Sequence, residues 1–386
     1  FSYSAHILIK FEPNRCYNRL MKYNWQQKNW PEFRYELSEI EDDLLTYAER
    51  SGQISGILKT MPEHSKMEAF IDRMVAEAIK TSEIEGEYVS RPDVIYSIRN
   101  GLGLDQKPPQ VRDKRALGVG ELMVDLRNTF AEPLTDKRLF LWHEMLMAGN
   151  RRLTIGAWRF HEEPMQVVSG SIGKEIVHFE APPSSLVPEK MRAFLNWYND
   201  TVPGGVNEIR KAPIRSAIAH LYFESIHPFE DGNGRIGRAI SEKALSQGVG
   251  KPMLISISQT IEKNKKAYYQ ALEKAQRSNE ITEWLKYFVK MLLDALSQTE
   301  AQIEFVLKKT KFLDQYLDDF NERQQLIINK MLADPDSFEI GISAKKYMVI
   351  TKVSKATATR DLQDLEEKKA LKSVGGGRST RYQINY

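Results

Sequence analysis

The chain has 386 residues and a net charge of +3, and its 41% hydrophobic and 28% charged residues are the composition of an ordinary globular protein of two or three domains. No run of about eighteen apolar residues is present, which argues against a membrane span. The single cysteine, Cys16, excludes an internal disulfide framework, and we expect a cytoplasmic protein.

The first twenty residues lack the positive start, the long apolar centre and the cleavage site of a signal peptide. The sequence does not begin with methionine, whereas Met21 precedes a new aromatic-rich segment. We therefore expect native translation to start at Met21, and residues 1–20 to be an upstream segment that need not be native.

Hydrophobic periodicity predicts two helices in an N-terminal domain over residues 21–112, one at residues 35–59 and one at 66–82. The apolar side of the first helix is expected to carry Leu37, Ile40, Leu44, Leu45 and Tyr47. Residues 100–103 contain two glycines and are expected to form a loop.

The second helix ends in an acidic segment in which Gly86 can serve as the C-cap. Glu83, Glu85 and Glu87 are most simply interpreted as a solvated helix end. Negative charge at a helix C-terminus is nevertheless unfavourable by roughly 0.3–1 kcal/mol, so this end calls for a cationic partner.

The next domain is expected to span residues 113–300 and to begin with helices at residues 119–129 and 136–147. The inward side chains of the second helix are predicted to be Leu139, Leu141, Met145 and Leu146. Residues 165–168 and 175–179 then flank a turn rich in Gly and Ser, which predicts a β-hairpin. Such a hairpin is either a plain surface excursion or an edge that holds a target segment by strand addition.

The most informative stretch lies between apolar helices predicted at residues 212–226 and 235–246. It reads His227-Pro228-Phe229-Glu230-Asp231-Gly232-Asn233-Gly234-Arg235-Ile236-Gly237-Arg238. Its two loop glycines let backbone N–H groups converge on an anion at the positive end of the second helix. Taken singly, a lone histidine and a Gly-Asn-Gly turn are commonplace. Together with two arginines on one helix face, they predict a site for a polyphosphate.

This stretch resembles the signature of the Fic family, His-x-Phe-x-(Asp/Glu)-Gly-Asn-Gly-Arg-x-x-Arg, at every fixed position. The resemblance implies a mainly α fold with a Fic-type helical core and a β-hairpin flap, and a protein adenylyltransferase that moves AMP from ATP to a Ser, Thr or Tyr hydroxyl of a target protein, itself included. It implies these roles: His227 as catalytic base, Asp231 as ligand of Mg²⁺, and Gly232, Asn233, Gly234, Arg235 and Arg238 as nucleotide-binding residues. Phe229 is interpreted as an apolar anchor beneath the loop.

Thr81-x-x-x-Glu85-Gly86 is similar to the inhibitory motif of Fic proteins. The resemblance implies that Glu85 pairs with Arg238, occupies the guanidinium meant for the γ-phosphate, and so silences the free protein. A sister branch that acts as a kinase has lysine at the second loop glycine, and Gly234 argues against that chemistry here.

The C-terminal part is expected to comprise a linker helix over residues 301–321 and a winged helix-turn-helix over residues 322–386. Residues 341–386 hold ten Lys and Arg against four Asp and Glu, which is +6, so the rest of the chain sums to −3. The third helix is expected to show Ala356, Thr359, Leu362 and Leu365 to the core, with Ser354, Thr357 and Ala358 near a DNA-facing surface. The tentative DNA-binding residues are Lys355, Arg360, Arg378 and Arg381. The alternative is a protein-docking or dimer module, since many winged helices serve only in that way.

Two other functions fit the same residues. The enzyme can remove AMP from a modified target, with Glu85 holding a water, or the chain can be a DNA-binding regulator that senses ATP with little turnover. The intact His227 and Asp231 favour catalysis, because sensing requires neither. We further expect a homodimer and no membrane partner.

Overall fold

The computed structural model of the chain describes residues 23–105, 109–150, 153–170, 174, 176–316, 319–333 and 338–386. The prediction for residues 1–20 lies outside them. The chain divides into two compact units, residues 1–60 with 66–300, and residues 61–65 with 301–386. The domains predicted at 21–112 and 113–300 therefore lie in one unit. Among the described residues, no helix combines the length and the apolar character needed to cross a membrane.

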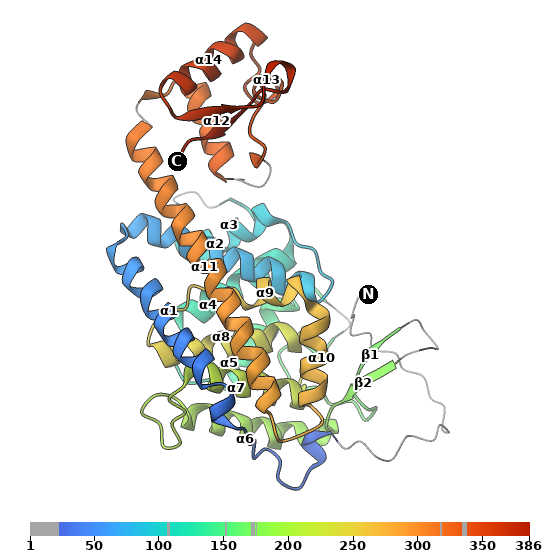
Figure 1. Cartoon of the computed structure of the whole chain (residues 1–386). Helices are drawn as coiled ribbons and strands as arrows, with labels where there is room; N and C mark the ends of the chain where they lie inside the picture. The colour runs from blue at the N-terminus through green and yellow to red at the C-terminus, as the bar shows by residue number, and fades with distance from the viewer. Residues whose placement is uncertain are drawn as a thin grey trace. The chain divides into compact units, whose positions relative to one another are not determined.

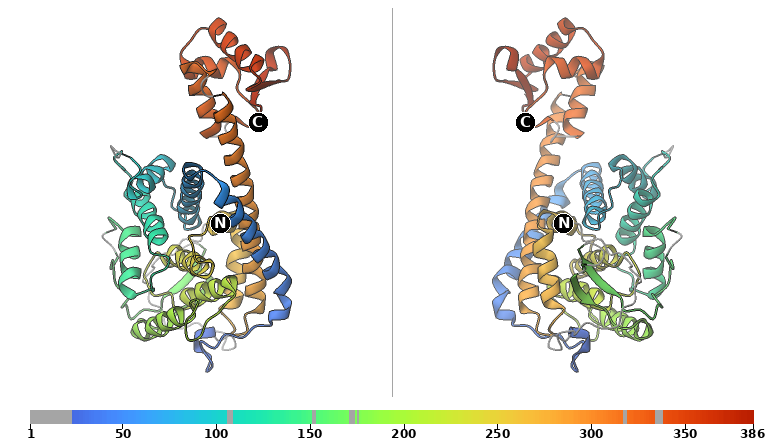
Figure 2. Two further views of the ribbon diagram at one scale, coloured as in Figure 1. Left: turned by 90° about the vertical axis from the view of Figure 1, so that its left-hand side faces the viewer. Right: turned by 90° about the vertical axis from the view of Figure 1, so that its right-hand side faces the viewer.

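The first unit is helical, as predicted, and contains one β-hairpin (Figure 1). Its helices are α1 (Glu41–Thr60), α2 (Glu63–Ile84), α3 (Arg91–Gly101), α4 (Lys114–Asn128), α5 (Asp136–Leu146), α6 (Val187–Asp200), α7 (Ala212–Ile226), α8 (Asn233–Val249), α9 (Ile257–Lys263), α10 (Lys265–Ala275) and the first part of α11 (Thr282–Tyr316). Helices α7 and α8 pack along each other at its centre (Figure 2), and every residue of α7 is buried. The signature stretch connects these two helices.

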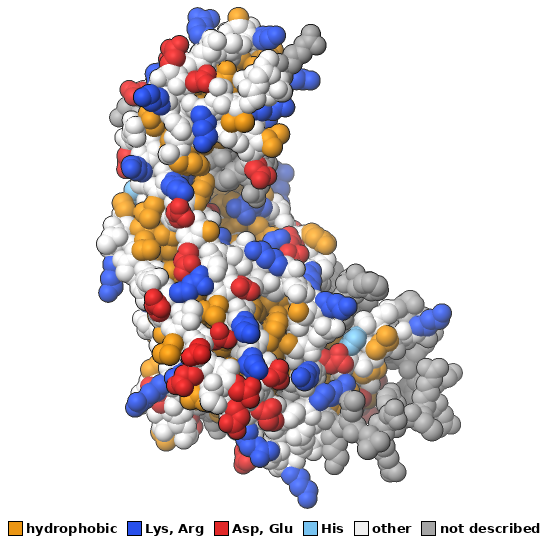
Figure 3. Space-filling view, in the orientation of Figure 1, with side chains coloured by type: hydrophobic (Ala, Val, Ile, Leu, Met, Phe, Trp, Pro, Cys, Tyr) orange, Lys and Arg blue, Asp and Glu red, His pale blue; other side chains and the backbone are white. Residues whose placement is uncertain are grey.

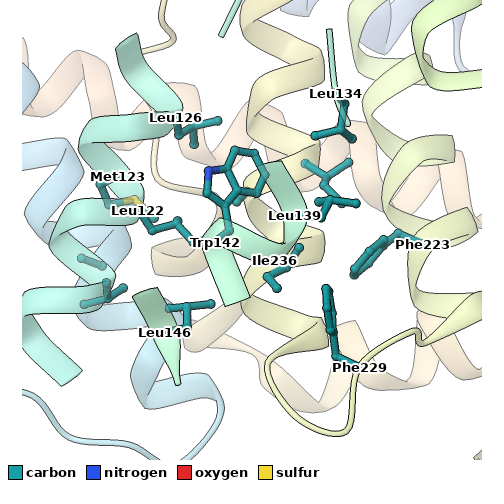
Figure 4. Packing of buried hydrophobic residues seen from close by; sticks show 14 of the residues in the cluster. Leu122, Met123, Leu126, Leu134, Leu139, Trp142, Leu146, Phe223, Phe229 and Ile236 are labelled. Atoms are coloured by element: carbon teal, nitrogen blue, oxygen red, sulfur yellow. The ribbon is translucent and has the colours of Figure 1, made fainter. Parts of the chain in front are cut away.

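The core of this unit lies directly beneath the signature stretch. Trp142 of α5, Phe223 of α7 and Ile236 of α8 belong to one buried cluster, and the Phe229 ring of the connecting loop points into it (Figure 4). Phe229 is fully buried and stacks on the His143 imidazole, with 4.2 Å between ring centroids. The predicted role of Phe229 as an apolar anchor is confirmed.

The predicted hairpin is present as strands β1 (Gln166–Ser169) and β2 (Ile176–Glu180). The strands are antiparallel, with Val167 opposite Phe179 and a register shift between Val167 and Val168. The Phe179 ring is buried and contacts the Tyr23 ring edge-on at 5.1 Å. The hairpin is therefore anchored at its base by apolar packing.

Four expectations for this unit were wrong. Helix α1 begins at Glu41 and not at residue 35, so Leu37 lies in a short 3-10 helix before it and is exposed. Leu45 is 64% exposed, because the buried stripe of α1 runs through Leu44, Tyr47 and Ile54 and leaves Leu45 beside it. Leu141 on α5 is likewise exposed. Helix α3 was not predicted: it begins after the N-cap Ser90 and ends at Gly101, so that only the end of the expected glycine loop, with Gly103 at φ +67°, is irregular.

The second unit has three helices after α11, namely α12 (Glu322–Ala333), α13 (Ala344–Thr351) and α14 (Lys355–Glu367), and the hairpin β3 (Leu371–Val374) with β4 (Arg381–Ile384). This is the predicted order of a winged helix-turn-helix. The expected linker region contributes to its core, because Phe312 of α11 and Phe320 pack with Leu362.

The predicted face of α14 needs correction. Ala358, Leu362 and Leu365 are buried together, whereas Ala356 is exposed. Positions 358, 362 and 365 follow the spacing of one helix face, so Ala358 belongs to the core and not to the expected DNA-facing surface.

Candidate active site

Hydrogen bonds from Arg159 hold the backbone of the loop between α7 and α8. His227 follows α7 in the left-handed conformation, at φ 50°. The Arg159 guanidinium donates to the His227 carbonyl at 2.8 Å, and the Arg159 N–H donates to the Pro228 carbonyl at 2.9 Å. Arg159 is buried, and burial lowers its pKa to about 10. It therefore holds the histidine end of the loop in place.

The other end of the loop forms an anion-binding helix start. Gly232 is the N-cap of α8 at φ 84°, a conformation that glycine adopts without strain. The first bond of the helix runs from Ile236 N–H to Gly232 C=O at 3.0 Å, which leaves the N–H groups of residues 233–235 directed out of the helix end. The Asn233 side chain accepts from Phe229 N–H at 2.9 Å and donates to Phe229 C=O at 2.8 Å, so that it closes the loop on itself.

Both signature arginines are buried and paired with acids from the end of α2. Arg238 donates to Glu85 Oε1 at 2.7 Å and to Thr81 Oγ1 at 2.8 Å. Arg235 donates to Glu87 Oε2 at 2.7 Å. The cationic partner expected for the acidic helix end is therefore present, and the interpretation as a solvated helix end was wrong for Glu85 and Glu87.

The electrostatics of this pairing keep the Arg238 guanidinium charged. Burial lowers the pKa of Arg238, but the attraction of Glu85 outweighs it, and the net pKa lies above its ordinary value. An added Cβ at position 234 would lie 2.2 Å from Glu85 Oε1 and 3.1 Å from Arg238 Nη1, so a larger residue there would displace the Glu85 carboxylate. Gly234 is thus the position at which α8 makes room for the acid.

Three of the signature residues line a cavity in the first unit. His227, Gly234, Arg238 and Glu85 form one side of it, and the hairpin contributes Val167 and Val168. Helix α10 and the residue after it complete the wall with side chains that include two tyrosines: Tyr268, Tyr269, Gln270, Leu272, Glu273 and Gln276. The cavity thus joins a polar end to a partly aromatic wall.

Asp231 is the expected ligand of Mg²⁺. Its side chain is 37% exposed, accepts from Gly232 N–H at 2.6 Å and lies 3.6 Å from Arg235 Nη2. Within the described residues, no group of three or more His, Cys, Asp or Glu could hold a metal by itself. A single carboxylate fits Mg²⁺ well, because this ion is commonly held by one or two carboxylates and the phosphates of its nucleotide.

Two contributors to the site were missed from the sequence. Arg159 acts across 68 residues of chain, and no local pattern marks it. Glu224 Oε2 lies 3.5 Å from His227 Nδ1. The sequence feature that could have identified it is an acidic residue in an otherwise apolar part of a helix. His220, on the same helix, is buried and hydrogen-bonded to the Tyr268 hydroxyl at 2.7 Å.

Comparison with known proteins agrees with this geometry. Residues 133–245 match the Fic/DOC family. Residues 23–104 match a domain of unknown function, DUF4172, and residues 338–385 match the C-terminal domain of DIP2311-like transcriptional regulators. The chain therefore carries a Fic/DOC family domain, and the resemblance seen in the signature is confirmed.

The relatives of the chain are distant. A probable protein adenylyltransferase of Aquifex aeolicus is 28% identical over 139 residues, which cover 32% of this chain and 39% of that protein. A Fic family protein of Desulfovibrio desulfuricans has a similar fold, with a TM-score of 0.52, 20% identity and coverage of 89% of this chain and 95% of its own. A Fic domain-containing signaling protein of Bacteroides thetaiotaomicron has a TM-score of 0.51 and 16% identity, with coverage of 69% of this chain and 96% of its own.

Proposed function

We propose that the chain is a protein adenylyltransferase that transfers AMP from ATP to a hydroxyl of a protein and is inhibited by its own Glu85. The observation that carries the proposal is the cavity in which His227, the start of α8 and Arg238 face one space. Nucleophilic attack at a nucleotide phosphorus requires a base, amides that bind phosphate and a guanidinium, and all three are present here. The name of the Aquifex aeolicus relative supports the same reaction class.

In the proposed reaction, His227 takes the proton of the target hydroxyl as its oxygen attacks the α-phosphorus. The new bond joins that oxygen to phosphorus, and the bond from the α-phosphorus to the bridging oxygen breaks, so that pyrophosphate leaves. The N–H groups of residues 233–235 hold phosphate oxygens, and Arg235 and Arg238 bind the outer phosphates. Mg²⁺, held by Asp231, would neutralise phosphate charge.

The proposed inhibition follows from the arginine pairing. While Arg238 is bonded to Glu85, its guanidinium is not free to hold the γ-phosphate in the orientation that aligns the α-phosphorus with His227. The acid also places negative charge at the wall of the cavity that a triphosphate enters.

Label transfer from ATP tests the reaction. We expect the Glu85→Gly protein with Mg-ATP to label protein from α-marked ATP and not from γ-marked ATP, and to gain mass as AMP adducts in intact-mass analysis. The native chain, measured in parallel, is expected to label little. Label from γ-marked ATP alone would show a kinase, and an unlabelled protein that removes AMP from a pre-modified target would show the reverse reaction.

We also propose that the second unit binds DNA, because its helix order and the regulator-like match at residues 338–385 favour this function. Lys355 and Arg360 are exposed on α14, and Arg381 is half-buried on β4. Arg378 lies in the turn between the strands, and its side chain is outside the described part of the chain. Lys and Arg side chains lie among Asp and Glu on the visible face of this unit (Figure 3).

Salt dependence of binding to duplex DNA tests this second function. A variant that makes one phosphate contact fewer has a slope of log K against log salt that is smaller by about one. We expect Arg360→Ala to reduce the slope by about one, whereas Lys308→Ala, which removes a surface cation of α11 paired with Glu304, should leave it unchanged. Equal slopes in both variants, or no binding at low salt, would rule out α14 as the DNA-facing helix.

A further inference from the structure

Glu224 is a charged residue in the most buried helix of the molecule. All of α7 is buried, and the Glu224 side chain is 5% exposed. On this helix His220 precedes Glu224 by four residues and lies on the same face, and His227 caps the end of the helix three residues after Glu224. A carboxylate in such surroundings is tolerated only if positive or proton-donating groups compensate its charge.

The Glu224 carboxylate lies next to His227, the proposed base. Its Oε2 atom lies 3.5 Å from His227 Nδ1. Neither Glu224 Oε1 nor His227 Nδ1 has a hydrogen-bond partner among the described residues. The two groups are therefore poised for each other at a separation slightly longer than a hydrogen bond, as is common for catalytic pairs before substrate binds.

Helix α8 leaves room for this carboxylate at one position. A Cβ on Gly237 would lie 2.4 Å from Glu224 Oε1, so a larger residue there would displace the acid. On the other side, the Gln276 amide donates to the Glu224 carbonyl at 3.2 Å and holds this turn of α7. The position of the acid is thus fixed by packing from α8 and by a hydrogen bond from the chain after α10.

The surroundings keep the carboxylate ionised. Burial raises the pKa of Glu224, but the contact with His227 and the attraction of Arg238 outweigh burial, and the net pKa lies below the ordinary value. Glu224 therefore presents a negative charge to the Nδ1 side of His227.

Building on the proposed AMP transfer, we propose that Glu224 is the positioning residue of the catalytic histidine. Its carboxylate accepts the Nδ1 proton of His227 and so selects the tautomer whose Nε2 lone pair faces the cavity. Nε2 then takes the hydroxyl proton as the oxygen–phosphorus bond forms and pyrophosphate departs. The resulting imidazolium lies beside the carboxylate until its proton passes to solvent. In the other tautomer, Nε2 carries a proton and accepts none.

The test compares Glu224→Gln and Glu224→Asp in the Glu85→Gly protein. We expect Glu224→Gln to lower kcat for AMP transfer by about 10²- to 10⁴-fold, the usual contribution of a positioned base, with the Kd for Mg-ATP unchanged. Glu224→Asp, which keeps the charge, should recover part of kcat. Nitrogen-15 NMR of the histidine rings, with His227→Ala identifying the signal, should show that the Nδ1-protonated form of His227 loses its dominance in Glu224→Gln.

Glu230→Gln is the matched control, because Glu230 is another buried acid next to a histidine, 2.6 Å from His161, and lies outside the cavity lining. It should leave the His227 tautomer unchanged. An unchanged tautomer and kcat in Glu224→Gln would overturn the proposal, as would an equal loss in Glu224→Asp and Glu224→Gln. If the Glu85→Gly parent transfers no AMP, the proposed function fails, while the tautomer still decides whether Glu224 orients the ring.

Discussion

Replacing His227 with alanine in the Glu85→Gly protein should lower the rate of AMP transfer by about 10²- to 10⁴-fold or more, because a positioned base supplies an acceleration of that size. The phosphate-binding parts of the site stay in place in this variant. The α8 start, Arg235 and Arg238 belong to another helix, and the loop is held through the backbone carbonyl of residue 227 by Arg159. Mg-ATP should therefore bind with nearly the parent affinity.

Initial rates of AMP transfer and calorimetric titration with Mg-ATP, on the same preparation, check this expectation. His161→Ala is a suitable control, because it removes a histidine bonded to Glu230 beside the loop but outside the cavity lining. A His227→Ala protein that keeps its rate would show that the target hydroxyl is activated by another group. A loss of ATP binding would instead mean that the side chain is needed to build the loop.

The parts of the site whose arrangement could be predicted from the sequence are those that lie within a few residues of one another. The local geometry of a turn and one helix start positions the loop glycines, Asp231 and the two arginines. Twelve residues of sequence were therefore enough to predict their arrangement. The cationic partner of the acidic α2 end was also predicted from local sequence, because charges at a helix terminus interact with the helix dipole. The identity of that cation came from the family resemblance.

The parts that were missed depend on contacts between distant segments. Arg159 contacts the loop from a position 68 residues earlier in the chain. The role of Glu224 can be recognised only once α7 and α8 are seen to pack together. Ala356 and Ala358 show a different limit of prediction from sequence. Both are small and apolar, so the sequence does not say which of them begins the buried stripe of α14, and the structure chooses Ala358.

Removing both acids at the end of α2 should strengthen Mg-ATP binding more than removing Glu85 alone. Glu87 occupies Arg235 at 2.7 Å as Glu85 occupies Arg238, so each signature arginine has its own competitor for phosphate. The Glu87 side chain is 30% exposed, which places its contribution at the low end of a charge-assisted hydrogen bond, about 1.5 kcal/mol. Since about 1.4 kcal/mol is a factor of ten, Glu87→Gln should raise ATP affinity about tenfold.

A double-mutant cycle decides whether the two acids act separately. Calorimetry on the native chain, Glu85→Gly, Glu87→Gln and the double variant gives four affinities. If the effects are independent they multiply, and the double variant binds Mg-ATP about tenfold more tightly than Glu85→Gly. Glu83→Gln is the matched control, because Glu83 lies on the same helix end but pairs with Lys80 at 2.6 Å, and it should leave the affinity unchanged. If Glu87→Gln changes nothing in either background, Arg235 serves the loop and not the nucleotide, and Glu85 is the sole inhibitory contact at this helix end.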